Sequence, residues 1–161
     1  MDWSPLYTMQ AQLDTYIVSH HDLSGKDLFR EKYLALLVEL GELANETRCF
    51  KFWSRKPRNK QSVILEEYVD GIHFILSLGL DKGYRYDSND LKPADTDETG
   101  QFNRVYEVCV TFYRDPSEAH YKQLFARYLQ LGKLLGFDEI AVKDAYLKKN
   151  EINYERQDQG Y

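Results

Sequence analysis

The chain has 161 residues, a length typical of one domain that buries its own hydrophobic core. Its formal net charge of −5 argues against binding to nucleic acid, and no apolar run is long enough to span a membrane. The two cysteines, Cys49 and Cys109, have neither metal-binding spacing nor the pattern of a disulfide framework, so we expect a cytoplasmic protein with reduced thiols.

Apolar side chains recur at helical spacing along most of the chain, and no segment has the alternation that is typical of a strand. We therefore predict an all-α bundle of about six helices that forms a single domain over residues 1–161. The expected helices cover residues 4–20, 26–47, 61–80, 101–113, 116–135 and 138–150, and residues 84–100 form a long polar loop. Ser4, Asp115 and Asp138 are the expected N-caps, and Gly136 ends the fifth helix.

The first expected helix combines an apolar stripe with polar residues. The stripe consists of Leu6, Met9, Leu13 and Ile17. Gln10, Gln12 and Asp14 lie between these positions, and polar residues on a terminal helix usually face solvent. Their position alone therefore does not mark them as part of a binding site.

Two consecutive helices each carry a pair of acidic residues, three positions apart, within an apolar run. Glu39 and Glu42 form the first pair, and Glu67 and Asp70 form the second. Residues three apart lie on nearly the same helix face, so the four carboxylates converge if the two helices pack face to face. Burying carboxylates without partners costs several kcal/mol, which either protonation or a bound cation relieves.

Clustered carboxylate oxygens suit hard cations, Mg²⁺ first and Mn²⁺ next. Because Mg²⁺ usually keeps several waters and shares its coordination with substrate phosphates, the pattern also predicts a phosphate ester as ligand. The alternative is a solvent-exposed charged face, which is the commoner meaning of a single acid pair on a helix. Two such pairs on successive helices, both set among Leu, Val and Ile, favour the metal site.

A basic and aromatic segment, residues 48–60, connects the two acidic helices and contains Trp53, Arg55 and Lys56. It is either a solvated loop or a mobile loop that brings cations to phosphates and an aromatic ring to a nucleobase. His73 lies three residues after Asp70 and therefore on the same helix face as the second acid pair. It is either a core histidine or a group that contacts a ligand.

The C-terminal segment, residues 147–161, has little apolar surface to bury but is rich in Asn, Gln, Arg and Tyr. A segment of this composition frays unless other parts of the protein hold it. The alternative is that it folds over a bound substrate and supplies polar contacts.

Together these motifs resemble the dimeric all-α dUTP pyrophosphatases, which are related to the MazG-type nucleotide pyrophosphatases. The interval between the two acid pairs matches that of the family. The other matching motifs are Gln10-x-x-Leu13-Asp14, Phe50-Lys-Phe-Trp53-Ser-Arg55-Lys56-Pro57, His73-Phe74 and Lys149-Asn150-x-x-Asn153-x-x-Arg156-Gln157-x-x-Gly160-Tyr161. The resemblance leaves mainly residues 84–145 unmatched. One departure is Asp14, where some members have Asn, because an ionised carboxylate cannot donate a hydrogen bond to uracil oxygens.

The resemblance implies a homodimer of the all-α NTP pyrophosphatase type that hydrolyses dUTP, and also dUDP, and so limits uracil incorporation into DNA and supplies dUMP for thymidylate synthesis. Two or three Mg²⁺ ions, replaceable by Mn²⁺, would bridge phosphate oxygens and lower the pKa of the attacking water. The implied ligands are Glu39, Glu42, Glu67 and Asp70. Glu39 and Glu42 would also be the catalytic residues, with Glu39 as the candidate acceptor of the water's proton.

The resemblance also implies how the nucleoside is bound. Gln10 would read the uracil edge, with Gln12 or Asp14 assisting. His73 would bond the sugar 3′-hydroxyl, and Phe74 would crowd the 2′ position and so favour deoxyribose.

The loop and the C-terminal segment would complete the site. Trp53 would lie near the base, either in its own subunit's site or in the partner's. The phosphates would be met by Arg55, Lys56, Lys149 and Arg156. Asn150 and Asn153 would help to bind the substrate, and Tyr161 would cover it.

Three alternatives stand beside this interpretation. A MazG-like pyrophosphatase acting on another nucleotide, such as dCTP or a damaged nucleotide, would use the same acid pairs. A di-iron carboxylate bundle would need Glu-x-x-His pairs, which neither acid pair provides. A helical interaction protein would use its acids only to bind a partner, and the two roles are compatible because some phage members of the family also bind a repressor.

Overall fold

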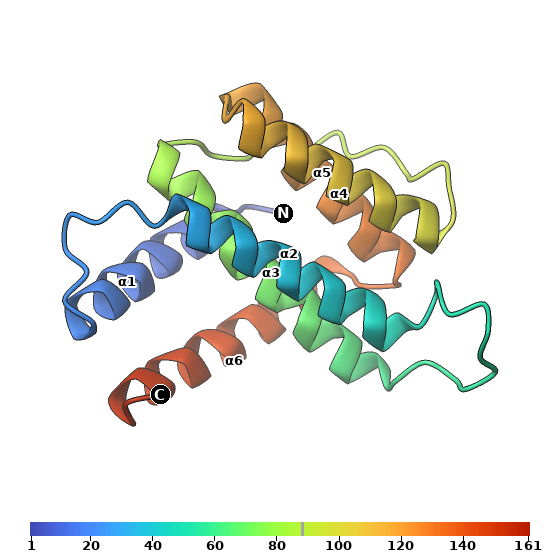
Figure 1. Ribbon diagram of the computed structural model, residues 1–161, viewed down its shortest axis with the longest axis horizontal. Coiled ribbons are helices and arrows are strands. Elements are labelled where there is room, and N and C mark those ends of the chain that lie inside the picture. Colours follow the sequence, from blue (N-terminus) through green and yellow to red (C-terminus); the bar gives the residue numbers. More distant parts are fainter. Residues whose placement is uncertain (88) are drawn as a thin grey trace.

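The computed structural model describes residues 1–87 and 89–161. Within these residues the fold consists of helices without any strand, as predicted for an all-α bundle (Figure 1). The helices are α1 (Ser4–His20), α2 (Phe29–Thr47), α3 (Gln61–Lys82), α4 (Glu98–Arg114), α5 (Glu118–Leu134) and α6 (Glu139–Asp158). In the described part of the chain, no helix has the length and apolar composition that crossing a bilayer requires.

Helix α3 is the centre of the bundle and contacts α1, α2, α5 and α6. Helices α4 and α5 form one layer beside it, and α1 and α6 lie on the opposite side (Figure 1). Between Tyr68 and Gly79 nearly every side chain of α3 is buried. A helix that is apolar on all sides is stable only when other helices cover all of it.

Glycines allow α3 and α5 to pack closely around tyrosine rings. A Cβ atom added at Gly71 would lie 2.0 Å from the Tyr128 hydroxyl, and one at Gly132 would lie 2.3 Å from the Tyr68 hydroxyl. The Tyr128 hydroxyl donates to the Tyr68 carbonyl at 2.8 Å, the Tyr68 hydroxyl donates to the Tyr128 carbonyl at 3.2 Å, and the two rings stack at 4.8 Å. The two helices are therefore joined by buried rings whose polar ends are satisfied.

Some of the predicted helix ends are confirmed and others are wrong. Asp138 caps α6 as predicted, because its carboxylate accepts from a backbone N–H of the first turn. Ser4 is the first residue of α1 rather than its cap, and its N–H donates to the carboxylate of Asp2 at 3.0 Å. Helix α5 is capped by the Ser117 hydroxyl and not by Asp115.

The largest difference lies at the C-terminus, where α6 continues to Asp158 although the sequence predicts an end near residue 150. Contacts with α1 hold this extension. The ring of Tyr154 packs against that of Tyr16 at 4.9 Å, and the Tyr16 hydroxyl donates to Asp158. The helix therefore persists because of tertiary contacts that lie far away in the sequence.

Candidate active site

Three carboxylates from two helices come together beside α6. Glu39 of α2 and Glu67 and Asp70 of α3 each place one oxygen atom within 4.8 Å of the others. Glu42, the second acid of the first pair, has an exposed side chain and lies outside this set, although its charge acts on both glutamates. The structure thus brings together three of the four predicted metal ligands and leaves the fourth at the solvent edge.

Burial makes it costly for all three carboxylates to be ionised together. Burial, followed by the charges of Asp70 and Glu42, raises the pKa of Glu39 to about 8. The same causes raise the pKa of Glu67 to about 7. Burial also raises the pKa of Asp70, against the effect of the nearby Lys149 ammonium. At neutral pH this cluster therefore favours either bound protons or a bound cation.

The donor set fits a hard divalent cation. All of its atoms are carboxylate oxygens, which Mg²⁺ and Mn²⁺ prefer. The Oε2 atom of Glu39 is buried and has no hydrogen-bond partner among the described residues. A buried carboxylate oxygen without a partner is costly, and a metal ion is one of the few groups that can satisfy it.

Lys149 of α6 partly neutralises the cluster. Its Nζ atom lies 3.0 Å from Asp70 and 3.1 Å from Glu66, and the side chain is buried. These carboxylates raise the pKa of Lys149 against the opposing effect of burial, so the ammonium stays charged at neutral pH. The sequence marked Lys149 as a phosphate contact but gave no sign of its ion pair with Asp70.

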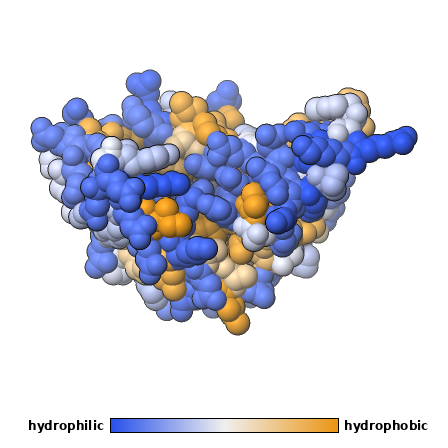
Figure 2. All heavy atoms as spheres, turned by 90° about the horizontal axis from the view of Figure 1, so that it is seen from below, coloured by the Kyte–Doolittle hydropathy of each residue, from blue (hydrophilic) through white to orange (hydrophobic). Residues whose placement is uncertain are grey.

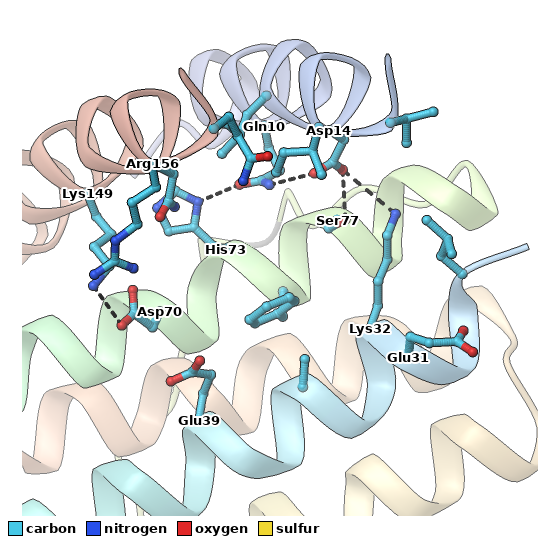
Figure 3. Close-up of a pocket in the computed structure, with 18 of the residues that line it drawn as sticks. Gln10, Asp14, Glu31, Lys32, Glu39, Asp70, His73, Ser77, Lys149 and Arg156 are labelled. Atoms are coloured by element: carbon cyan, nitrogen blue, oxygen red, sulfur yellow. Dashed lines mark hydrogen bonds and ion pairs between the residues drawn. The ribbon is translucent and has the colours of Figure 1, made fainter. Parts of the chain in front are cut away.

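A cavity of about 560 Å³ opens next to the carboxylates, between α1, α2, α3 and α6 (Figure 3). It is lined by these sequence-predicted residues: Gln10, Asp14, Glu39, Asp70, His73, Phe74, Lys149, Asn153, Arg156 and Tyr161. Lys32 and Ser77 also line it, and the sequence gave no reason to select either of them. The volume is in the range of small-molecule sites.

A hydrogen-bonded chain of polar side chains forms the wall of the cavity at α1 (Figure 3). The Oε1 atom of Gln10 lies 2.7 Å from Nδ1 of His73, and the Nε2 atom donates to Asp14 at 2.8 Å. The other carboxylate oxygen of Asp14 accepts from the Ser77 hydroxyl at 2.7 Å and lies 3.9 Å from the Lys32 ammonium. Burial raises the pKa of Asp14, and these three contacts oppose that effect.

His73 is buried but not fully satisfied. Its ring stacks on the ring of Tyr146 at 4.2 Å, and burial, assisted by the charge of Lys149, lowers its pKa to about 3. The imidazole is therefore neutral at pH 7. Its Nε2 atom has no hydrogen-bond partner among the described residues. Since His73 also lines the cavity, it is a core residue that keeps one polar atom available for a ligand.

Several predicted site residues lie elsewhere. Gln12 is exposed on α1 and does not line this cavity, and Asn150 is buried without reaching it. Trp53, Arg55 and Lys56 belong to the exposed loop between α2 and α3, which projects from the right-hand end of the molecule in Figures 1 and 2. They do not line the cavity of their own chain.

No curated protein matches the chain. The model of the dUTPase family matches residues 2–161, which is almost the whole sequence. The match includes both acid-bearing helices and every element that lines the cavity. The chain therefore belongs to the dUTPase family, in its all-α branch, and is a dUTP diphosphatase.

Proposed function

We propose that this dUTPase is Mg²⁺-dependent, converts dUTP to dUMP and diphosphate, and also accepts dUDP. The observation that carries the proposal is the carboxylate cluster of Glu39, Glu67 and Asp70 at the edge of the cavity. Bound Mg²⁺, two or three ions or Mn²⁺ in their place, would neutralise phosphate charge and activate water. The reaction would limit uracil incorporation into DNA and supply dUMP in the cytoplasm.

Acidic and basic residues of the chain have separate roles around the phosphates. Glu39 presents a buried oxygen without a hydrogen-bond partner among the described residues, which supports its role as acceptor of the attacking water's proton. Glu42 lies one turn further along α2 and would complete the ligand set once a cation draws it inward. Lys149 and Arg156 line the cavity with positive charge, and we assign them to the phosphates.

At the other end of the cavity, polar groups suit the nucleoside. Gln10 retains one N–H for a carbonyl oxygen of uracil, and the Nε2 atom of His73 suits the 3′-hydroxyl. Phe74 lines the same cavity and would exclude a 2′-hydroxyl by contact. Asn153 and Tyr161 belong to the segment 147–161, which we propose closes over the bound nucleotide.

We also propose that the protein is a homodimer. Neighbouring helices α2 and α4 leave a group of apolar side chains exposed to solvent, consisting of Leu34, Val38, Val110 and Tyr113. Exposed apolar side chains grouped on adjacent elements are typical of an interface between subunits. Trp53, which is 64% exposed in the projecting loop, would then contact the substrate of the partner subunit.

The dimer is tested by sedimentation of the Val38→Glu variant, which places a charge in the proposed interface. Ile140→Glu is the matched control, because Ile140 is 74% exposed at the start of α6 and away from this face. We expect the first variant to sediment as a monomer and the second to sediment like the unmodified protein. A dimer in both variants would place the interface elsewhere.

The reaction is tested by measuring diphosphate released from dUTP, dCTP, dATP, dGTP and dTTP, with Mg²⁺ and with excess chelator. We expect Mg²⁺-dependent release from dUTP alone, lost in the Glu42→Gln variant and kept in the matched control Glu107→Gln on the exposed face of α4. Equal turnover of dCTP would instead support a broader MazG-like pyrophosphatase. Near-normal activity of the Glu42→Gln variant would reject the catalytic role of Glu42.

A further inference from the structure

The hydrogen-bond partners of Gln10 determine how its side-chain amide is oriented. Gln10 is 3% exposed, and its side-chain amide makes three hydrogen bonds within the chain. One end of the amide faces the carboxylate of Asp14, which can only accept when it is ionised. That end must therefore be the NH₂ group. The carbonyl oxygen then faces the Tyr146 hydroxyl at 3.0 Å and the Nδ1 atom of His73 at 2.7 Å.

The orientation of Gln10 decides which nitrogen of His73 carries the proton. A carbonyl oxygen only accepts, so the Nδ1 atom of His73 must donate to it and must hold the single ring proton of the neutral imidazole. The other nitrogen, Nε2, is then a pure acceptor. It is buried, and no described residue donates to it.

We propose that Asp14 is a positioning residue that fixes His73 as a hydrogen-bond acceptor toward the ligand, through the orientation of the Gln10 amide. The inference rests on the proposed function for the identity of the ligand, whose sugar hydroxyl would be the donor to Nε2. It does not require Asp14 to touch the substrate. This agrees with the inability of an ionised carboxylate to donate to uracil oxygens.

The surroundings of Asp14 predict what the Asp14→Asn variant does. Ser77 donates to Oδ2 and the Lys32 ammonium lies nearest to the same atom, so both favour an oxygen there. The introduced asparagine would keep its oxygen toward them and turn its NH₂ group toward Gln10. The Gln10 amide must then flip and present its own NH₂ group to His73. The ring proton would move to Nε2, and His73 would become a donor toward the ligand.

The tautomer is measured in the metal-free protein, without any substrate, from long-range ¹⁵N–¹H spectra of the imidazole rings. The chain has four histidines, and the His73→Gln variant identifies the signals of His73. We expect the proton on Nδ1 in the unmodified protein and on Nε2 in Asp14→Asn. A proton on Nε2 in the unmodified protein, or an unchanged tautomer in the variant, would overturn the proposal.

Tyr146→Phe is the matched control. It removes a buried hydroxyl from the same network but leaves the bond between Asp14 and Gln10, so the proton should stay on Nδ1. If Asp14 only supported the fold, Asp14→Asn would lower the melting temperature without moving the proton. The position of the proton therefore distinguishes positioning from support of the fold.

Ligand binding provides a second, separate readout. A 3′-fluoro analogue of dUMP can accept weakly but cannot donate, so the unmodified protein should bind it roughly 5- to 150-fold more weakly than dUMP. In Asp14→Asn this ratio should fall toward one, because Nε2 would then donate. If the tautomers behave as expected but the ratio is one in both proteins, the assignment of the 3′-hydroxyl fails while the role of Asp14 stands.

Discussion

Replacing Glu39 by glutamine should make the metal-free enzyme more stable at alkaline pH. Burial and the charges of Asp70 and Glu42 raise the pKa of Glu39 from 4.5 to about 8. The folded protein therefore holds a proton that the unfolded chain loses above pH 4.5. The free energy of unfolding therefore falls as the pH rises from about 4.5 to about 8. The raised pKa of Glu67 lowers it further up to about pH 7.

The size of the effect follows from the pKa difference. A change from 4.5 to about 8 corresponds to nearly 5 kcal/mol at roughly 1.4 kcal/mol per pKa unit. Because the Glu39 side chain is only half buried, solvent screening reduces this to about 2 kcal/mol. In a protein of this size, that should raise the melting temperature of Glu39→Gln by about 4–8 °C at pH 8.

The assay is thermal unfolding of both proteins at pH 5 and pH 8, with excess chelator and with Mg²⁺. At pH 5 the folded protein is already protonated at Glu39, so the variant should gain little. Mg²⁺ should stabilise the unmodified protein at pH 8, by about 2.7 kcal/mol at a hundredfold excess over Kd, and stabilise the variant far less. A variant that is less stable than the unmodified protein at pH 8 in chelator would refute the reasoning.

Three further substitutions, the first with a matched control, test the packing and the cavity. Gly71→Ala should lower the free energy of unfolding by about 3 kcal/mol or more in a denaturant titration, because the new Cβ would lie 2.0 Å from the Tyr128 hydroxyl. Gly41→Ala is the matched control and should be neutral or stabilising, because its Cβ would lie 3.4 Å from its nearest neighbour. Phe74→Ala should raise kcat/KM for UTP relative to dUTP, and an unchanged ratio would remove Phe74 from sugar selection. Lys149→Met should raise the KM for dUTP at least tenfold in steady-state kinetics, because Asp70 loses its partner and the phosphates lose a charge; an unchanged KM would contradict this.

The approximate positions of the helices could be predicted from the sequence because apolar periodicity is a local signal. Of the predicted N-caps, Asp138 is confirmed before α6, whereas Ser4 and Asp115 are wrong by one and two residues. The end of α6 could not be predicted. It depends on contacts of Tyr154 and Asp158 with Tyr16, which only the folded chain brings together.

The candidate site also has a part that the sequence predicts and a part that it does not. The convergence of Glu39, Glu67 and Asp70 follows from spacing along two helices that pack together. Spacing alone could not separate Glu39 from Glu42, because a step of three residues turns about 300° around the helix and leaves the second side chain about 60° away. On α3 the same spacing keeps both Glu67 and Asp70 in the cluster, whereas on α2 only Glu39 belongs to it and Glu42 is exposed.

Two buried polar atoms without a partner among the described residues lie beside the cavity and indicate what it binds. Between α3 and α5, buried polar atoms are paired, as in the mutual hydrogen bonds of Tyr68 and Tyr128. Around the cavity, Glu39 and His73 each keep a buried polar atom without a partner among the described residues. Each such atom costs about 1–3 kcal/mol, and the tyrosine-packed core offsets that cost. A ligand that supplies a cation to the Glu39 oxygen and a hydroxyl to the His73 nitrogen removes the free-energy cost at both atoms. This favours a deoxynucleotide bound with a divalent metal over either component alone.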